Sequence, residues 1–275
     1  MSDPIEALPP LREVIAQHDL AARKALGQNF LLDLNLTRKI ARAAMPWTAG
    51  TVIEIGPGPG GLTRALLLEG APGVIAVERD ERCIAALQPL AEAAGGRLTV
   101  HPGDALETDF ADLAPPPWQV VANLPYNIAT PLILHWVARA EHFTRITVLV
   151  QKEVAERLAA KPGSKTYGRL SVAAQWRCEV RMLFDIGPKA FVPPPKVTST
   201  LVELQPRERP LADANPRKLE RVTAAAFNQR RKMLRAALKP LWADADAKLQ
   251  KAGIDPTRRA ETLSIKEFCA LARLL

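Results

Sequence analysis

Short apolar runs alternate with amphipathic segments over the first 160 residues of the chain. Runs of β-branched and aliphatic residues predict strands, and apolar residues at every third or fourth position predict helices. The predicted strands cover 51–55, 74–77, 98–100, 119–122 and 146–150, and the predicted helices cover 11–18, 33–44, 62–68, 81–93, 131–140 and 153–160. This alternation predicts βαβ units on a parallel sheet with helices on both faces.

The pattern changes after about Leu170. Two β-like runs, 179–184 and 199–204, flank a proline-rich segment, and 205–210 has the composition of a linker. From 215 to 275 the chain is rich in Ala, Leu, Arg and Lys, with apolar residues at helical spacing, which predicts a small helical domain. We therefore predict an α/β domain over 1–205 and a helical domain over 206–275.

The composition, with 48% hydrophobic and 24% charged residues, is ordinary for a globular protein with a full core. No apolar run approaches the roughly 18 residues of a membrane span. The N-terminus carries acidic residues and lacks the basic-then-apolar pattern of a signal peptide. Cys83, Cys178 and Cys269 lie far apart without metal-ligand spacing, so we expect reduced thiols in a cytoplasmic protein.

Basic residues are concentrated in one part of the chain. The net charge is +8, and residues 206–239, with ten basic and three acidic residues, carry +7 of it. A helix predicted around 227–238 has one apolar face, with Arg231, Lys232 and Arg235 largely on its other faces. Such a helix could be merely solvated, but the concentration of charge favours a polyanionic partner.

A glycine-rich run from Glu54 to Gly61 follows the first predicted strand and opens a helix. Its glycines allow a tight turn and close approach of a ligand, and Glu78, at the end of the next strand, could bind ribose hydroxyls. These features fit both a nicotinamide enzyme and a methyltransferase. Glu54 before the turn favours S-adenosylmethionine, as do Pro57 and Pro59, which remove amide donors that a pyrophosphate would need.

Two polar motifs follow the next strands. Asp104 could accept a hydrogen bond from a cofactor adenine, although aspartate in such a place also caps helices. The run Asn123-Leu124-Pro125-Tyr126 ends the fourth strand. An adenine amino nitrogen is a poor nucleophile and needs acceptors for its two hydrogens, which the Asn123 side chain and the Leu124 carbonyl could supply.

In this interpretation Pro125 stiffens the turn and Tyr126 stacks on the base. The same four residues could also form an ordinary turn, because Asn and Pro are common in turns. Their place after the glycine turn, Glu78 and Asp104 favours the chemical role.

Four motifs together resemble the ribosomal RNA small-subunit adenine dimethyltransferases, a family that includes the bacterial enzyme linked to kasugamycin sensitivity. They are the runs 27–31, 54–61, 123–126 and 191–197, and the resemblance extends from about Lys24 to the C-terminus. It implies a Rossmann-like, seven-stranded class I methyltransferase sheet with a small all-helical C-terminal domain. It also implies N6,N6-dimethylation of two adjacent adenines in a loop near the 3′ end of 16S rRNA.

The resemblance assigns roles to individual residues. By motif match, the residues that bind S-adenosyl-L-methionine are Asn29, Leu31, Gly56, Glu78, Asp104 and Asn123. The residues that hold the target adenine are Asn123, Leu124, Pro125, Tyr126 and Phe191, with Phe191 stacking opposite Tyr126. A hydrophobic anchor for its loop is the alternative role of Phe191. The segment from Leu20 to Leu32 would be a lid.

The expected partner is 16S rRNA within the immature 30S subunit, contacted by Arg230, Arg231, Lys232 and Arg235. We expect a monomer, with no membrane association. Three alternatives stay open from the sequence: a DNA adenine methyltransferase, a non-enzymatic RNA-binding or assembly factor, and a nicotinamide oxidoreductase.

Overall fold

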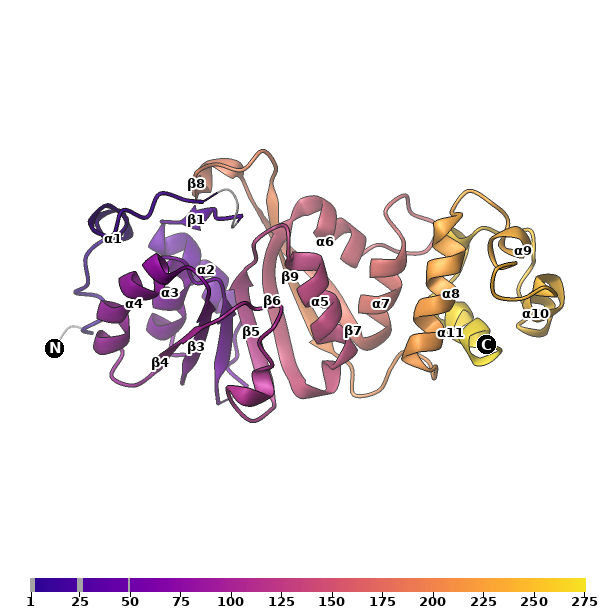
Figure 1. Ribbon diagram of the computed structural model, residues 1–275, viewed down its shortest axis with the longest axis horizontal. Coiled ribbons are helices and arrows are strands. Elements are labelled where there is room, and N and C mark those ends of the chain that lie inside the picture. Colours follow the sequence, from indigo (N-terminus) through magenta and orange to yellow (C-terminus); the bar gives the residue numbers. More distant parts are fainter. Residues whose placement is uncertain (1–2, 24–26, 49) are drawn as a thin grey trace. The chain divides into compact units, whose positions relative to one another are not determined.

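The computed structural model describes residues 3–23, 27–48 and 50–275 (Figure 1). They form two compact units. The first combines Met1–Ile133, Glu141–Ala155 and Arg181–Gln205, and the second combines Leu134–Ala140, Glu156–Val180 and Pro206–Leu275. The chain enters the second unit for the last time after Gln205, where the sequence places the domain boundary, but this unit also includes two earlier segments.

Seven strands form one sheet in the order β4-β3-β2-β5-β6-β9-β7 (Figure 1). The strands are β2 (Val52–Ile55), β3 (Val74–Glu78), β4 (Leu98–Pro102), β5 (Trp118–Asn123), β6 (Phe143–Gln151), β7 (Cys178–Ile186) and β9 (Ser199–Pro206). The first five run parallel, and β9 pairs antiparallel with β6. The predicted seven-stranded α/β sheet is confirmed. The strand order reverses between β2 and β5, the kind of position where open sheets bind ligands.

The helices predicted for the first part of the chain are all present, with boundaries shifted by a few residues. They are α1 (Leu11–Gln17), α2 (Leu34–Ala43), α3 (Gly61–Leu68), α4 (Glu81–Ala93), α5 (Ala129–Ala138) and α6 (Lys152–Leu158). Asp33 caps α2, accepting from the Asn35 amide at 2.9 Å. Short 3-10 helices are η2 (Phe110–Asp112), η3 (Ala140–His142), η4 (Pro188–Ala190) and η5 (Ala260–Thr262). No helix in the described ranges is long and apolar enough to cross a bilayer.

Packing on both sides fixes the glycine turn in place. Every residue of β2 is buried, and so are residues 61–67 of α3. The turn 56–60 joins these two buried elements, so it cannot move without disturbing the core.

A two-stranded ribbon, which the sequence does not predict, joins distant segments. In it, β1 (Phe30–Leu31) pairs antiparallel with β8 (Phe191–Val192). The ribbon passes so close to α3 that a Cβ at Gly61 would lie 2.5 Å from the Leu31 carbonyl oxygen. The glycine is therefore required there by close backbone approach.

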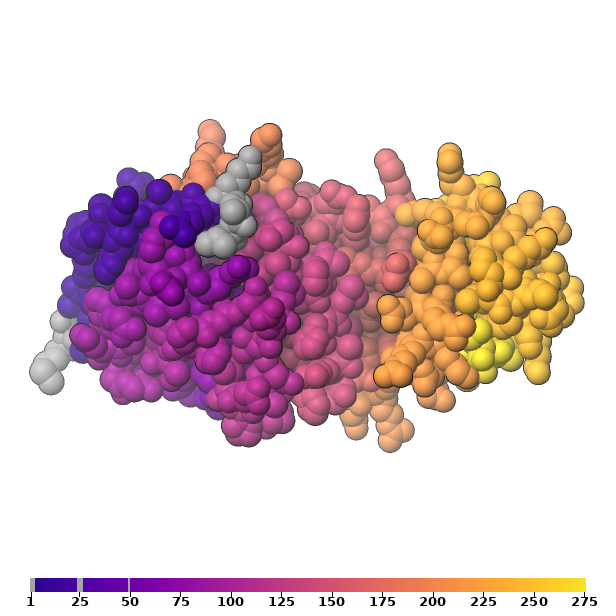
Figure 2. All heavy atoms as spheres, viewed as in Figure 1, coloured from indigo at the N-terminus to yellow at the C-terminus, as the bar shows by residue number. Residues whose placement is uncertain are grey.

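The second unit is helical and has a core of its own. Besides the ends of α5 and α6, its helices are α7 (Arg169–Arg177), α8 (Pro216–Asn228), α9 (Leu234–Ala237), α10 (Ala245–Lys251) and α11 (Ile265–Arg273), coloured coral to yellow in Figures 1 and 2. Helix α7 does not appear in the prediction. Its buried Val172, Ala174 and Trp176 alternate as in a strand, and buried Ser171 lies among them, so it lacks an apolar stripe.

The single helix predicted around 227–238 is wrong. Phe227, Leu234 and Leu238 have helical spacing, but α8 ends at Asn228 and a turn separates it from α9. Met233 instead forms a β-bridge with Arg259. The backbone of this segment forms hydrogen bonds with a distant part of the chain, and a local sequence pattern cannot predict such contacts.

Candidate functional site

A pocket opens at the carboxyl ends of β4, β3, β2 and β5, around the point where the strand order reverses. The six residues predicted to bind a cofactor all line it: Asn29, Leu31, Gly56, Glu78, Asp104 and Asn123. Four of them follow or end the four neighbouring strands, and the other two come from the segment that includes β1. The fold therefore brings these six residues together around one cavity.

The glycine amides of the turn donate hydrogen bonds to other groups of the protein. Its three glycines have φ values of +64°, +56° and +89°, in the left-handed region that favours glycine. Their amides donate to the Val77 carbonyl, the Glu78 carboxylate and the Pro57 carbonyl. Pro57 and Pro59 carry no N–H, so residues 56–60 offer no amide to a pyrophosphate, which a dinucleotide site would need.

Glu78 anchors this turn and faces the pocket. Its Oε2 accepts from the Gly58 amide at 3.1 Å, and its Oε1 accepts from the amides of Arg79 and Asp80, both at 2.9 Å. Burial raises the pKa of Glu78, and the three backbone hydrogen bonds oppose that rise. Each carboxylate oxygen can accept more than one hydrogen bond, so Oε2 can still receive a ligand hydroxyl.

Asp104 lies at the next strand end and is held from two sides. Its Oδ1 accepts from the Leu106 amide at 3.0 Å, and its Oδ2 pairs with Arg79 Nη1 at 2.9 Å. Arg79 also lines the pocket, and the sequence analysis missed it. The available signal was its place directly after Glu78, at the end of a strand.

Glu54 is a buried acid at the back of the pocket. Burial raises its pKa to about 8, and the nearby Glu78 carboxylate adds to the rise. Within the described part of the chain its Oε2 has no hydrogen-bond partner. A buried polar atom without a partner is costly, so Glu54 can accept a hydrogen bond from a bound donor, and a positive charge on that donor would favour the ionised carboxylate.

The pocket suits a cationic ligand that carries hydroxyl and amino groups. Glu54, Glu78 and Asp104 contribute three carboxyl groups, and Arg79 is the single basic residue of the described lining. S-adenosylmethionine offers an ammonium, a sulfonium, ribose hydroxyls and an adenine, all of which match these acceptors. A pyrophosphate would meet like charges.

Asn123 has one end of its side chain fixed. Its Nδ2 donates to the Asn29 carbonyl at 3.0 Å, which sets the orientation of the amide. No hydrogen bond in the described ranges uses Asn123 Oδ1 or the Leu124 carbonyl oxygen. These are the two acceptors that the sequence predicts for an adenine amino group, and both residues line the pocket.

Pro125 and Tyr126 complete the turn and also line the pocket. The Pro125 carbonyl accepts from the amides of Ile128 and Ala129, at the start of α5. The Tyr126 hydroxyl shares a hydrogen bond of 2.8 Å with Ser199 Oγ. The hydroxyl is thereby tied to β9, so the ring has a fixed position beside the pocket.

Phe191 lies elsewhere. Its ring is only 2% exposed and belongs to the core of the first unit, with β8 paired to β1 through Leu31. It is not among the residues that line the pocket. In this conformation the ring anchors its loop and cannot stack on a base.

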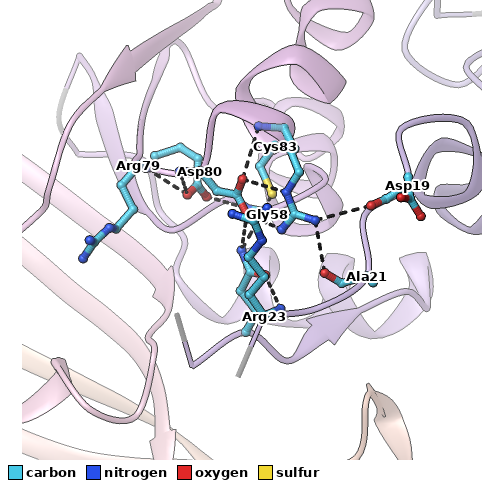
Figure 3. Close-up of polar contacts among 10 residues, drawn as sticks. Asp19, Ala21, Arg23, Gly58, Arg79, Asp80 and Cys83 are labelled. Carbon is cyan, nitrogen blue, oxygen red and sulfur yellow. Dashed lines mark hydrogen bonds and ion pairs between the residues drawn. The ribbon is translucent and has the colours of Figure 1, made fainter. Parts of the chain in front are cut away.

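The segment before β1 is tied to the start of α4, as Figure 3 shows. Gln28 Nε2 donates to Asp80 Oδ2 at 3.0 Å, and Arg82 pairs with the same carboxylate at 2.7 Å. Arg82 also donates to the carbonyls of Asp19 and Ala21, both at 3.3 Å. These bonds attach Asp19, Ala21 and Gln28 to the start of α4, in the segment where we expect a lid.

The hydrogen bond from Arg82 is the main cause that lowers the pKa of Asp80 to about 2. This pair was not predicted from the sequence, although both residues follow Glu78 closely in the chain. Lys24, which the lid prediction includes, lies outside the described residues.

The four basic residues predicted to contact RNA differ in their surroundings. Arg231, Lys232 and Arg235 are exposed. Arg230 is partly buried, with Nε donating to Glu261 Oε2 at 2.7 Å and Nη2 to the Ser164 carbonyl at 3.2 Å. Three side chains are therefore open to a ligand, and the fourth holds segments of the second unit together.

Comparison with known proteins gives concordant matches. Residues 20–275 match the family described as ribosomal RNA adenine dimethylase. Ribosomal RNA small subunit methyltransferase A of Rhodospirillum rubrum is 60% identical, over 99% of this chain and 97% of its own. The protein of the same name from Paramagnetospirillum magneticum is 61% identical, over 98% of this chain and 95% of its own.

Two solved structures share the fold over most of their length. A dimethyladenosine transferase from Plasmodium falciparum has a TM-score of 0.74 and 28% identity, covering 87% of this chain and 94% of its own. The 23S rRNA methyltransferase ErmE has a TM-score of 0.70 and 26% identity, covering 89% of this chain and 98% of its own.

These matches confirm the predicted methyltransferase activity, the predicted cofactor S-adenosylmethionine and the predicted class of substrate, adenine in ribosomal RNA. The nicotinamide alternative fails on the acidic pocket and the occupied amides of the glycine turn. With a family match over residues 20–275, the chain belongs to the ribosomal RNA adenine dimethylase family.

Proposed function

We propose that the protein methylates the exocyclic amino groups of two adjacent adenines in a loop near the 3′ end of 16S rRNA, in the immature 30S subunit, giving N6,N6-dimethyladenosine. The observation that carries the proposal is Asn123, whose Nδ2 is fixed by the Asn29 carbonyl while its Oδ1 stays open to the pocket. The names of the relatives, which specify the small subunit, support the choice of rRNA.

The residues around the glycine turn would hold S-adenosylmethionine, which supplies a methyl group on a positively charged sulfur. Glu54 would accept from its ammonium group, Glu78 from its ribose hydroxyls, and Asp104 from its adenine amino group. Asn29, Leu31 and Gly56 would supply backbone and apolar contacts, because they line the same cavity. Fixed acceptors of this kind orient a ligand without reorganisation during the reaction.

The turn after β5 would hold the target adenine. Asn123 Oδ1 and the Leu124 carbonyl would accept its two amino hydrogens, which favours a pyramidal nitrogen whose lone pair is less delocalised into the ring. Tyr126 offers a face for stacking, and Pro125 limits the motion of the turn. A stacking role for Phe191 requires the β1–β8 ribbon to move, since its ring is buried in the core.

Outside the pocket, we assign contact with rRNA phosphates to the exposed cations Arg231, Lys232 and Arg235. A base in a duplex or a packed loop must be exposed before its amino group can be reached, so contacts beyond the pocket are needed to hold the RNA. The buried free thiols of all three cysteines support a cytoplasmic location.

The direct test incubates the protein with unmethylated 30S subunits and S-adenosylmethionine labelled in its methyl group. We expect labelled N6,N6-dimethyladenosine at two adjacent positions after nuclease digestion, and no label in DNA offered under the same conditions. Absence of dimethyladenosine from the digested rRNA would overturn the proposal.

A further inference from the structure

Six exposed basic side chains lie on three connections of the second unit. They are Lys161 and Lys165 between α6 and α7, Arg231, Lys232 and Arg235 between α8 and the end of α9, and Arg259 before η5. We call this set the three-loop surface. Only the middle connection was predicted from the sequence, because it carries a run of basic residues, whereas each of the other two carries only two basic residues.

Hydrogen bonds join the three connections directly. The β-bridge between Met233 and Arg259 places the second beside the third, and the Leu234 amide donates to the Arg258 carbonyl at 2.7 Å. The Gly163 amide donates to the Glu261 carbonyl at 2.7 Å, which attaches the first connection to η5. The connections that carry the six cations are therefore adjacent in the fold, although they are far apart in the sequence.

Arg230 is the centre of this arrangement. Its guanidinium pairs with the Glu261 carboxylate at 2.7 Å and donates to the Ser164 carbonyl at 3.2 Å. The pair is partly buried, with 34% and 31% of the two side chains exposed. One side chain therefore fixes the α6–α7 connection against the other two, and Lys161 and Lys165 lie on either side of the contact.

The charges of the surface are not neutralised from within. Across the described residues, no ion pair involves Lys161, Lys165, Arg231, Lys232 or Arg259, and Asp255 is the acid near Arg235. Elsewhere in the same unit the basic groups of Arg207 and Arg258 are paired with glutamates. Unpaired cations held close together repel one another, so their arrangement favours a polyanionic ligand.

We propose that the three-loop surface binds RNA phosphates and that the Arg230–Glu261 pair is a positioning element, which places Lys161 and Lys165 beside the cations of the α8–α9 connection. The proposal rests on the proposed function, because it takes ribosomal RNA as the polyanion. It changes the role of Arg230, which acts by holding the surface together rather than by touching phosphate. RNA is favoured over an acidic protein because six exposed cations are concentrated on these connections, and Met233, 43% exposed, is the only exposed large apolar side chain on their described residues.

The first test reverses two charges on the connection between α6 and α7, which was not predicted from the sequence. Lys161→Glu with Lys165→Glu is compared with Arg217→Glu and Lys251→Glu, an equal charge change at exposed positions on α8 and α10, outside the surface. Binding of unmethylated 30S subunits is measured from about 0.05 to 0.3 M salt. Loss of two phosphate contacts predicts binding weaker by roughly 20-fold near 0.15 M salt, and a shallower salt slope, in the first pair only.

Equal binding by the two double variants would overturn the proposal. Tighter binding to a polyglutamate peptide than to rRNA in matched salt would also overturn it, in favour of a protein partner. Melting temperature and cofactor affinity are measured for each variant, and both should match those of the wild-type protein.

The second test distinguishes a positioning role of the Arg230–Glu261 pair from the effect of net charge alone. Glu261→Ala makes the surface more positive by one charge, so charge alone predicts equal or tighter RNA binding, whereas loss of positioning predicts binding weaker by severalfold. Glu261→Asp keeps the carboxylate and should restore most of the affinity. Unchanged or tighter binding by Glu261→Ala would remove the positioning role.

Failure of the proposed function would look different. A wild-type protein that binds rRNA but forms no dimethyladenosine would refute the proposed function, and the two tests above would still decide this inference. Normal methylation together with unchanged binding by Lys161→Glu with Lys165→Glu would refute this inference alone.

Discussion

The pocket and the three-loop surface differ in the sign of their charges and in how those charges are held. The pocket has three carboxyl groups, and two of them, Glu78 and Asp104, accept hydrogen bonds from backbone amides that fix their position. The three-loop surface has six exposed cations on long flexible stems, anchored only through the backbone and Arg230.

This difference matches the two ligands. A small cationic cofactor must be held in one orientation, so its acceptors are buried and set in place before it binds. A large polyanion supplies many equivalent phosphates, so the cations that meet it can stay mobile and solvated. We therefore expect the pocket to respond mainly to loss of individual hydrogen bonds, and the surface mainly to salt and total charge.

The largest expected effect is that of salt. Raising the salt from about 0.05 to 0.2 M should weaken binding of unmethylated subunits by up to roughly 1,000-fold if all six cations meet phosphates. Cofactor affinity should change by less than about twofold, because the pocket acids are buried or hydrogen-bonded. If salt weakened binding of the cofactor and of the subunits equally, the contrast between the pocket and the surface would be refuted.

The double variant Arg231→Glu with Arg235→Glu should weaken subunit binding and flatten its salt slope. Cofactor affinity should stay intact.

A second large effect is expected at Asn123. Asn123→Ala removes the side-chain acceptor for the target amino group, and we expect the rate of methyl transfer in single turnover to fall by about 100-fold or more. Binding of subunits to the three-loop surface should stay within about twofold. Asn35→Ala, an exposed asparagine on α2, serves as the control. Methyl transfer at the wild-type rate by Asn123→Ala would refute the proposed role.

A smaller effect is expected at Asp104. Asp104→Ala removes the acceptor for the cofactor adenine. We expect the Kd for S-adenosylmethionine to rise by about tenfold, which corresponds to the free energy of about one hydrogen bond. Glu107→Ala, an exposed acid in the same loop, is the matched control and should bind normally. Calorimetric titration measures both affinities, and equal affinities would remove Asp104 from the binding site.

The smallest effect concerns the pH dependence of stability. The pKa of Glu54 is raised from 4.5 to about 8 in the folded protein, so its contribution to stability is full below about pH 4.5 and is lost as the pH rises to 8. Glu54→Gln removes this ionisation. We expect the variant to melt several degrees above the wild-type protein at pH 9 and close to it at pH 5. An equal difference at both pH values would show that Glu54 does not titrate in this range.

Most of the first unit could be predicted from the sequence because its signals are local. Buried parallel strands have continuous apolar runs, as in Val52–Ile55, and Asp33 marks a helix start directly beside the helix it caps. Four of the six predicted cofactor residues follow or end parallel strands, whose carboxyl ends meet at one edge of the sheet. The other two, Asn29 and Leu31, were predicted only from the family resemblance.

The predictions that failed or were missing depend on distant contacts. Helix α7 is buried on several sides, so it has no amphipathic stripe, and the break after Asn228 depends on the pairing of Met233 with Arg259. Arg79 was missed because its importance comes from the ion pair with Asp104, across two strands.

The sequence by itself determined the α/β sheet, the glycine turn, the acids around it and the tetrapeptide after β5, because strand periodicity, turn chemistry and motif order are all properties of neighbouring residues. Only the tertiary structure decided that the Phe191 ring is buried, that Arg230 joins two connections, and that the connection of Lys161 and Lys165 is attached to that of Arg231. These facts depend on which segments pack together, and burial or pairing of a side chain is set by its neighbours in space rather than in sequence.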